Sequence, residues 1–197
     1  QFVLSKYRLP DPVKKHLKII LRNSENANRI IKDLLDFAKP REISFKMGNI
    51  KDVIDGACNL IKVRCQRQRV RFVRKWSRRL PSILLDEKRL EEAFLNFILN
   101  SLDAMPGGGR LMINAHPDFE ANEAVVSFLD TGEGITPENL NKMFTPFFST
   151  KEDGVGLGLC LAHQVISYHK GRINIESKLG QGTDIVVRLP FSGREIE

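Results

Sequence analysis

The sequence predicts an α+β fold in which helices layer against one face of a mixed β-sheet, preceded by one long helix. Apolar side chains recur at heptad spacing through the segment before Pro40 and stop there. Beyond Pro40, several strand-like segments follow one another directly, whereas a doubly wound parallel sheet separates its strands by helices. The chain has 197 residues, of which 42% are hydrophobic, and this composition supports a sizeable core.

The first predicted element is a helix that is capped by Asp11, has Pro12 at its first position and ends before Pro40. Its seam positions alternate in spacing between four and three residues: Val13, Leu17, Ile20, Ser24, Ala27, Ile31, Leu34 and Ala38. Four more apolar residues widen this stripe beyond a two-stranded seam: Ile19, Ile30, Leu35 and Phe37. The wider stripe favours a four-helix bundle, and we expect the partner helices to come from a second copy of the chain.

Residues 41–197 are predicted to form the layered domain. After a linker and a short strand, a helix begins at the cap Asn49 and turns apolar side chains inward from Ile50 to Ile61. The elements that follow are a basic strand 69–75, a short strand 81–86 ending at the helix cap Asp86, a helix 87–104, strands 110–116 and 124–130, a mobile stretch of about 136–155, a helix of about 157–169, and strands 171–177 and 183–190. This order gives roughly five or six strands and three helices.

Charge and cysteine content limit the class of protein. Much of the net charge of +7 lies between Lys62 and Arg79. This stretch is either a nucleic-acid patch or a solvated helix end followed by a strand with one basic face, and we expect the second. The three cysteines (Cys58, Cys65 and Cys160) lack zinc-site spacing, and two residues seven apart on a helix are too distant for a disulfide. They indicate a reducing, cytoplasmic setting.

The sequence gives no sign of membrane insertion. No apolar stretch approaches the roughly 20 residues of a transmembrane helix, and no signal peptide is recognisable. Because the chain begins with Gln1, we expect a fragment whose upstream part could carry a sensor or an anchor. Any link to a membrane would run through those upstream residues.

The predicted helix 87–104 carries two stripes. Its core face is apolar and contains Leu90, Ala93, Phe94, Phe97, Ile98 and Leu102. The second stripe, spaced by four, four and three residues, contains Glu92, Asn96, Asn100 and Asp103. Asparagine is a poor helix former, so two asparagines one turn apart suggest amide oxygens directed at a ligand. A merely solvated stripe is the alternative.

Two glycine-containing segments suggest a nucleotide pocket. In "SFLDTGEGI", Asp130 either caps a turn or forms a pocket floor that accepts a base's amino group, with Gly132 and Gly134 allowing close approach. In "GVGLGL", a glycine turn precedes a helix whose amide groups could face phosphate. The second segment is neither a Walker A loop nor a Rossmann fingerprint, because no G-K-[ST] follows and no strand leads into it.

Taken in order, the motifs resemble bacterial sensor histidine kinases. "NFILNSLDAM", "DTGEGI", "FTPFFSTK" and "GVGLGL" are similar to the family's N, G1, F and G2 boxes, and "GQGTDIVVRLP" to its closing strand pair. "NSENANRIIKDLLDFAKP" resembles the second helix of the dimerisation and histidine-phosphotransfer domain. The resemblance implies a Bergerat ATP-binding sandwich over 41–197. It also implies that residues 1–40 end a helical dimerisation domain, through which the chain would form a homodimer.

The resemblance also implies residue roles. Asp130 would bind the adenine amino group, Asn100 would ligate Mg²⁺, and Asn96 and Lys151 would take catalytic positions beside metal water and phosphate. Thr183 would lie under the adenine, and the segment "FTPFFSTKEDGVG" would be a lid that closes over ATP. The whole implied ATP site comprises Asn96, Asn100, Asp103, Asp130, Gly132, Gly134, Ile135, Lys151, Gly154, Val155, Gly156, Leu157, Gly158, Leu159 and Thr183.

The chain departs from the family at two points. Many members have a basic residue where this chain has Asp103, which leaves Lys151 as the expected phosphate cation. The family's phosphorylated histidine is followed by an acidic residue, and none of the four histidines here fits that pattern: His16, His116, His163 and His169. We therefore expect the H box to lie upstream of Gln1.

Three functions remain open, and the first is favoured. The chain could be a kinase core that passes the γ-phosphate of ATP to a histidine and then to the aspartate of a response-regulator receiver domain. It could instead be a hydrolytic ATPase related to type II topoisomerases or heat-shock chaperones. Those enzymes place a glutamate base where this chain has Asn96, and an amide cannot take that proton. A nucleotide-binding module without phosphotransfer is the third reading.

Overall fold

A computed structural model describes residues 10–38, 43–151 and 154–191 of the chain. Its elements in chain order are α2 Asp11–Ala38, β1 Lys46–Asn49, α3 Ile50–Arg67, β2 Val70–Trp76, β3 Ser82–Leu85, α4 Glu87–Asp103, β4 Gly109–Asp118, β5 Glu123–Asp130, α5 Pro137–Leu140, α6 Gly158–Tyr168, β6 Arg172–Lys178 and β7 Gly182–Pro190. The predicted elements are present with boundaries shifted by one or two residues. The short helix α5, inside the stretch predicted to be mobile, was not expected.

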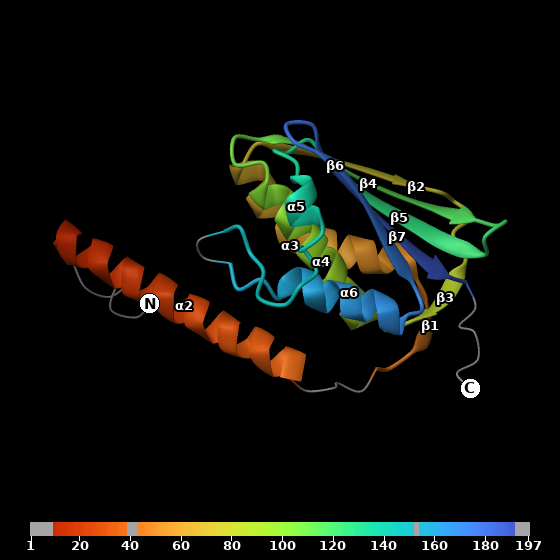
Figure 1. Cartoon of the computed structure of the whole chain (residues 1–197), viewed down its shortest axis with the longest axis horizontal. Helices are drawn as coiled ribbons and strands as arrows, with labels where there is room; N and C mark the ends of the chain where they lie inside the picture. The colour runs from red at the N-terminus through yellow and green to blue at the C-terminus, as the bar shows by residue number, and fades with distance from the viewer. Residues whose placement is uncertain (1–9, 39–42, 152–153, 192–197) are drawn as a thin grey trace.

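A five-stranded mixed sheet forms one layer of the domain. Its strand order is β2-β4-β5-β7-β6, and only the β2–β4 pair is parallel. Helices α3, α4 and α6 lie together over one face of this sheet (Figure 1). Strands β1 and β3 pair separately as a two-stranded antiparallel sheet. The layered α+β architecture predicted from the sequence is confirmed.

The core lies between the sheet and the three helices. Phe94 and Phe97 on α4 pack against Phe128 on β5, with ring centroids 5.2 and 5.6 Å from that of Phe128. All three side chains are fully buried, and burying each stabilises the fold by about 1.5–3 kcal/mol. Two of the three predicted helix caps are present, because the Asn49 side chain accepts from Lys51 N and the Asp86 side chain from Arg89 N. Asp11, the third, is the first residue of α2 rather than its cap. The aromatic contacts fix how closely α4 packs on the sheet, and the two caps fix the residues at which α3 and α4 begin.

Helix α2 presents apolar surface that the rest of the described chain leaves exposed. Its exposed large apolar side chains are Val13, Ile19, Ile20, Ile31, Leu34 and Leu35. They belong to the stripe predicted from the heptad spacing, and such a stripe requires a partner to be buried. The side chains of Ile30, Phe37 and Ala38, together with Pro40, lie outside the described residues. Pairing with a second copy of the chain stays a prediction.

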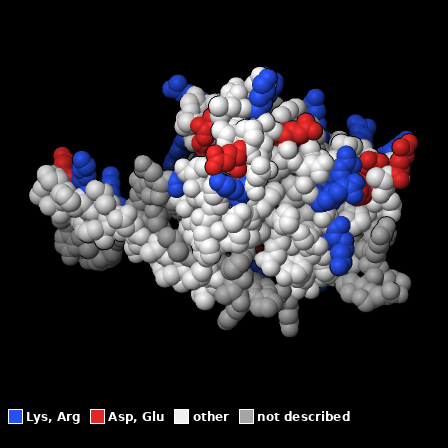
Figure 2. Space-filling model, in the orientation of Figure 1, with Lys and Arg blue, Asp and Glu red and all other residues white. Residues whose placement is uncertain are grey.

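The basic stretch between Lys62 and Arg79 is partly neutralised by acidic neighbours. Arg74 on the edge strand β2 contacts Asp55 on α3 at 2.7 Å. On the face shown in Figure 2, Lys and Arg side chains stand among Asp and Glu side chains and form no continuous basic field. This arrangement agrees with a solvated basic face. The absence of a nucleic-acid partner stays a prediction.

All three cysteines are described, and none forms a disulfide. Cys58 and Cys65 are buried along α3, and burial raises the pKa of the Cys58 thiol to about 12. That thiol is therefore a small apolar core group rather than a nucleophile. No helix in the described part of the chain is long and apolar enough to cross a membrane.

Candidate functional site

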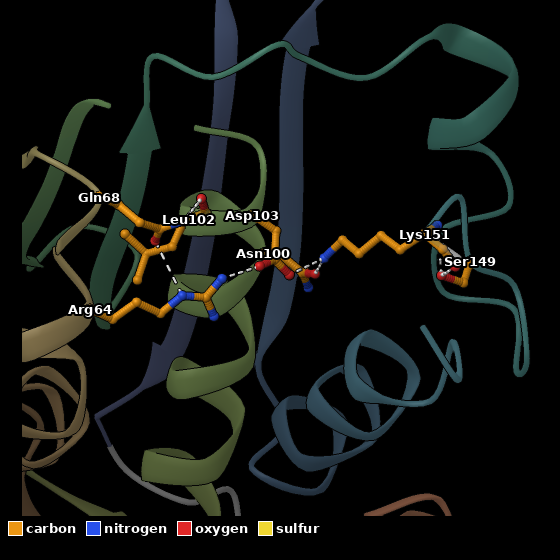
Figure 3. A network of polar contacts seen from close by, with 7 residues as sticks. All are labelled: Arg64, Gln68, Asn100, Leu102, Asp103, Ser149 and Lys151. Carbon is orange, nitrogen blue, oxygen red and sulfur yellow. Dashed lines mark hydrogen bonds and ion pairs between the residues drawn. The ribbon is translucent and has the colours of Figure 1, made fainter. Parts of the chain in front are cut away.

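The two predicted stripes of α4 lie on different sides of the helix. The six predicted core residues from Leu90 to Leu102 are buried against the sheet and the neighbouring helices. Asn96, Asn100 and Asp103 are only partly buried. Asn100 and Asp103 face Lys151 in the segment between α5 and α6 (Figure 3), and Asn96 lies beside the start of α6. Because the apolar face of α4 is buried in the core, the helix is rigid and fixes the direction of the three polar side chains. The site is built around these side chains.

Asp130 ends strand β5 and is almost completely buried. Its Oδ1 atom accepts hydrogen bonds from Gly132 N at 2.9 Å and from Thr183 N at 3.2 Å. Among the described residues, both hydrogen bonds to this carboxylate end on Oδ1, which leaves Oδ2 as an acceptor without a donor. Oδ2 is not among the fully enclosed, unpartnered oxygens of the described residues, so an external amino group can reach it.

The turn after Asp130 packs tightly on the end of α4. A Cβ atom added to Gly132 would lie 2.7 Å from the Ala104 Cβ, so no larger residue fits there without movement. Glu133 N also donates to the Ala104 carbonyl at 3.1 Å, which ties the turn to the helix. Gly134 has a φ of 72°, in the left-handed region that favours glycine. The fold of the turn itself therefore requires both glycines, and their predicted role in letting a ligand approach stays a prediction.

A chain of hydroxyl contacts borders Asp130. Thr183 Oγ1 lies 2.9 Å from Ser177 Oγ, which also accepts a hydrogen bond from Ile135 N at 2.8 Å. Thr183, Ile135 and Asp130 therefore come together although they lie far apart in the sequence. Ser177 was not predicted, because nothing in the local strand pattern distinguishes it from a solvated strand residue.

The second glycine segment leads into α6. Leu157 is fully buried, and α6 begins at Gly158 without a side-chain cap, which leaves its first amide groups available for an anion. A Cβ added to Gly158 would lie 3.1 Å from Asn96 Oδ1, so the start of α6 lies directly beside Asn96. Gly156 has a φ of 73° and packs on the backbone of Phe147 and Phe148. This packing folds the predicted lid segment back towards α6.

Lys151 joins the lid segment to α4. Its Nζ atom lies 2.6 Å from Asn100 Oδ1 and 2.5 Å from Asp103 Oδ2 (Figure 3). The other oxygen of Asp103 accepts a hydrogen bond from Arg64 on α3. Partial burial alone would raise the pKa of Asp103, but the hydrogen bonds and charges of Lys151 and Arg64 outweigh it and lower that pKa.

The structure brings the predicted residues together in two groups, both against the C-terminal half of α4. One group lies around Asp130, with Gly132, Gly134, Ile135 and Thr183. The other lies along α4 and the lid, with Asn96, Asn100, Asp103, Lys151 and Gly158. Of the remaining predicted residues, Leu159 lies in the first turn of α6, and the others precede that helix: Gly154, Val155, Gly156 and Leu157. Arg64 was not predicted as part of the site, since it lies outside every motif.

Comparison with known proteins places this arrangement in a family. Residues 85–193, just over half of the chain, match the family of histidine kinase-, DNA gyrase B- and HSP90-like ATPases. The chain belongs to this family. The match covers α4, the turn after Asp130, the lid segment and the strands to β7, and therefore includes every predicted site residue.

Within the family, the similar proteins are sensor histidine kinases. Sensor histidine kinase ZraS of Salmonella typhimurium strain LT2 is 29% identical over 178 residues, which are 90% of this chain and 38% of ZraS. The chain spans well under half the length of the curated relatives it matches. The resemblance to sensor histidine kinases inferred from the boxes is thus confirmed at the level of the ATPase domain and its neighbouring helix.

Two solved structures show the same fold. Full-length ShkA in complex with AMPPNP matches with a TM-score of 0.80 and 26% identity, over 98% of this chain and 42% of ShkA. Histidine kinase ThkA in complex with the response regulator protein TrrA matches with a TM-score of 0.78 and 23% identity, over 96% of this chain and 55% of that one. The predicted Bergerat sandwich is confirmed by these folds.

The ion pairs of Asp103 predict a pH dependence of stability. Its pKa is lowered from the ordinary value of 3.8, so the ion pairs stabilise the fold above that pH and lose this effect as the pH falls through the lowered pKa. We expect Asp103→Asn to lower the free energy of unfolding at pH 7. We expect the difference from wild type to shrink below about pH 4.

Urea unfolding across a series of pH values measures this difference. Arg64→Gln and Lys151→Gln should each remove part of the same pH dependence, because each removes one of the two cations that hold Asp103. An equal loss of stability for Asp103→Asn at pH 3 and at pH 7 would contradict the assignment.

Proposed function

We propose that this chain is the ATP-binding core of a sensor histidine kinase. In this role it presents the γ-phosphate of ATP to a histidine, from which the phosphoryl group passes to the aspartate of a response-regulator receiver domain. One observation carries the proposal: a carboxylate acceptor on a buried residue and a cluster of cation-binding groups both lie against the C-terminal half of α4. The named activities of ZraS and the AMPPNP complex of ShkA support it.

At the base-binding end, Asp130 Oδ2 is the acceptor for the adenine amino group. The carboxylate cannot rotate freely, because Gly132 N and Thr183 N hold its other oxygen. The absent side chain at Gly132 lets the turn lie against Ala104 at the end of α4, and Thr183 borders Asp130 on the other side. A fixed, buried acceptor distinguishes adenine from bases that lack a donor at this position.

At the phosphate end, the free amide groups at the start of α6 and the Lys151 ammonium supply positive potential. The donor set also fits Mg²⁺, because Asn100 Oδ1 already faces a cation at 2.6 Å and amide oxygens are suitable Mg²⁺ ligands. The described residues contain no group of three His, Cys, Asp or Glu side chains placed for a metal, so phosphate oxygens and water would complete the coordination. Bound there, Mg²⁺ would offset phosphate charge during transfer.

The immediate surroundings of Asn96 favour phosphotransfer over hydrolysis. A hydrolytic enzyme needs a carboxylate base near the phosphates, and Asn96 beside Gly158 is an amide that cannot accept a proton. Of the acidic residues on α4, Asp103 is held by Arg64 and Lys151. Glu92 pairs with Arg89 at 3.0 Å and Glu91 lies against Gly56 on α3. In the described residues, none of the three contacts the start of α6.

The remainder of the proposal concerns partners. We assign residues 1–40 to the end of a dimerisation and histidine-phosphotransfer domain and 41–197 to the ATP-binding domain. The exposed apolar stripe of α2 supports a homodimer formed through a helical bundle. A receiver domain is the proposed recipient of the phosphoryl group, supported by the response-regulator complex of the fold relative ThkA.

The four histidines do not suit phosphorylation. His169 is buried, its Nδ1–H donates to Val165 O, its Nε2 accepts from Asp86 N, and burial lowers its pKa. His163 packs against the Phe144 ring, and His16 Nδ1 contacts the Pro12 carbonyl. Within the described residues, no histidine contacts an acidic side chain that could orient the ring and take its proton. We infer that none of these four histidines is the phosphorylated residue.

Replacing the proposed adenine acceptor should weaken nucleotide binding. We expect Asp130→Asn to lower the affinity for ADP with Mg²⁺ by about 1.5–3 kcal/mol, because a charged acceptor becomes a neutral amide. Isothermal titration calorimetry measures the change. Asp118→Asn is the matched control, since Asp118 pairs with Arg188 on the strand β7 and lies outside the site. Unchanged ADP affinity in Asp130→Asn would remove the basis of the adenine assignment.

The lid should be the most mobile described part of the ATP-binding domain before nucleotide is added. Residues 136–151 include exposed Phe147, and Met143 is the residue among them that is buried. We expect their amide hydrogens to exchange much faster than those of α4, and to slow when ATP and Mg²⁺ are added. Hydrogen exchange followed by mass spectrometry measures both rates. Equally slow exchange in the lid and in α4 without nucleotide would refute the lid assignment.

The 197-residue chain should bind ATP without labelling itself. We expect no acid-labile label after incubation with γ-labelled ATP, because within the described residues none of the four histidines forms a hydrogen bond or ion pair with an acidic side chain. His16→Gln is the control, since His16 is the histidine of the bundle helix. Acid-labile label on the chain that disappears in His16→Gln would identify His16 as the acceptor and overturn this expectation.

A further inference from the structure

Arg64 reaches the site from a helix that carries none of the sequence motifs. It lies near the end of α3 and donates to Asp103 Oδ1, while its Nε donates to Gln68 Oε1 at 3.2 Å. Gln68 is itself held to α4, because its Nε2 donates to the Leu102 carbonyl at 3.5 Å. The guanidinium is therefore braced from both α3 and α4 (Figure 3).

The charge of Asp103 needs an explanation at this position. A carboxylate one turn from Asn100 would repel the polyphosphate of the proposed nucleotide. Asp103 is instead contacted by two cations, Arg64 on one oxygen and Lys151 on the other, so the three charges sum to +1. The arrangement retains positive potential at the phosphate end and places the acidic group between the two cations.

We propose that Arg64 and Asp103 are positioning residues that hold the Lys151 ammonium at the phosphate end of the site. This inference rests on the proposed function. Lysine is a point charge on a flexible stem of four carbons, so its location depends on what holds it. Asp103 is anchored on the rigid side by Arg64, and its second oxygen meets Lys151 at 2.5 Å. Rigid helices thereby fix a cation that belongs to the lid.

The contacts of Lys151 leave it able to bind phosphate while it stays held. An ammonium has three N–H donors. In the described structure two of them face Asn100 Oδ1 and Asp103 Oδ2, and the turn below is fixed by the bond from Lys151 N to Ser149 Oγ at 3.1 Å. One donor remains for a phosphate oxygen. If Mg²⁺ takes the Asn100 oxygen, repulsion moves the ammonium from Asn100, and Asp103 still retains it.

The competing interpretation is that Asp103 has no role in the site and only forms a surface ion pair, which contributes little to stability. The two interpretations predict opposite changes in nucleotide affinity when Asp103 is removed. Removing a bystander carboxylate from the phosphate end should strengthen nucleotide binding, because it removes a negative charge. Removing a residue that positions Lys151 should weaken it, although the net local charge becomes more positive.

Calorimetry with the β,γ-imido analogue of ATP and Mg²⁺, on the whole 197-residue chain, measures the affinity and so distinguishes the two interpretations. We expect Asp103→Ala to weaken binding about threefold to tenfold, and Asp103→Glu to restore part of the loss. In a Lys151→Ala background, Asp103→Ala should cause no further loss, because the cation it positions is gone. Unchanged or tighter binding in the single variant Asp103→Ala overturns the inference, and so does an equal loss in both backgrounds.

Arg64 has a matched control in Arg74 on strand β2, which pairs with Asp55 on the same helix α3. We expect Arg64→Gln to weaken binding of the analogue about twofold to fivefold and Arg64→Lys to weaken it less. Arg74→Gln breaks the Arg74–Asp55 pair, whose side chains are exposed to a similar degree, and should leave affinity unchanged. Equal effects of Arg64→Gln and Arg74→Gln overturn the role of Arg64. A wild-type chain that binds no adenine nucleotide contradicts the proposed function instead, so the two failures are distinguishable.

Discussion

The packing of α4 against the sheet is the interaction on which the site depends. Phe94 and Phe97 on one face of the helix meet Phe128 on the central strand β5, and all three are fully buried. Since a helix is rigid, burying this face fixes the direction of the opposite one, where Asn96, Asn100 and Asp103 project. The same helix end supports the turn that follows Asp130. Displacement of α4 would therefore move both ends of the site together.

The two ends of the site are held by different kinds of contact. Around Asp130, backbone amides and close glycine packing fix the acceptor within the sheet, so this end is preorganised. At the other end, Lys151 belongs to the lid and is held through side-chain contacts with Asn100 and Asp103. Side-chain ion pairs that are partly exposed exchange partners at low cost. This arrangement suits the proposed nucleotide, whose base would contact the fixed Asp130 group and whose phosphates would contact Lys151 on the lid.

Local patterns in the sequence predicted much of the fold and the site. Helical periodicity separated the core face of α4 from its polar stripe, because 3.6 residues per turn fix which side chains share a face. The caps Asn49 and Asp86 were recognisable because capping requires a short side chain with an acceptor before a helix. The order of the boxes identified the family. The sequence did not indicate the short helix α5, whose proline, glutamate and asparagine also suit an irregular lid.

The sequence by itself determined which residues could bind a nucleotide. Each motif of amides, carboxylates or glycines lies within a single helix or turn, so its spacing can be read directly from the sequence. Tertiary structure alone decided which charges meet. Arg64 and Asp103 are 39 residues apart, and Lys151 is 48 residues from Asp103. Arg64 looked like one of many solvated cations in a basic stretch, and Asp103 looked like a departure from the family. Their pairing depends on α3 and α4 packing side by side, and a periodic pattern within one helix carries no information about the surface that its neighbour presents.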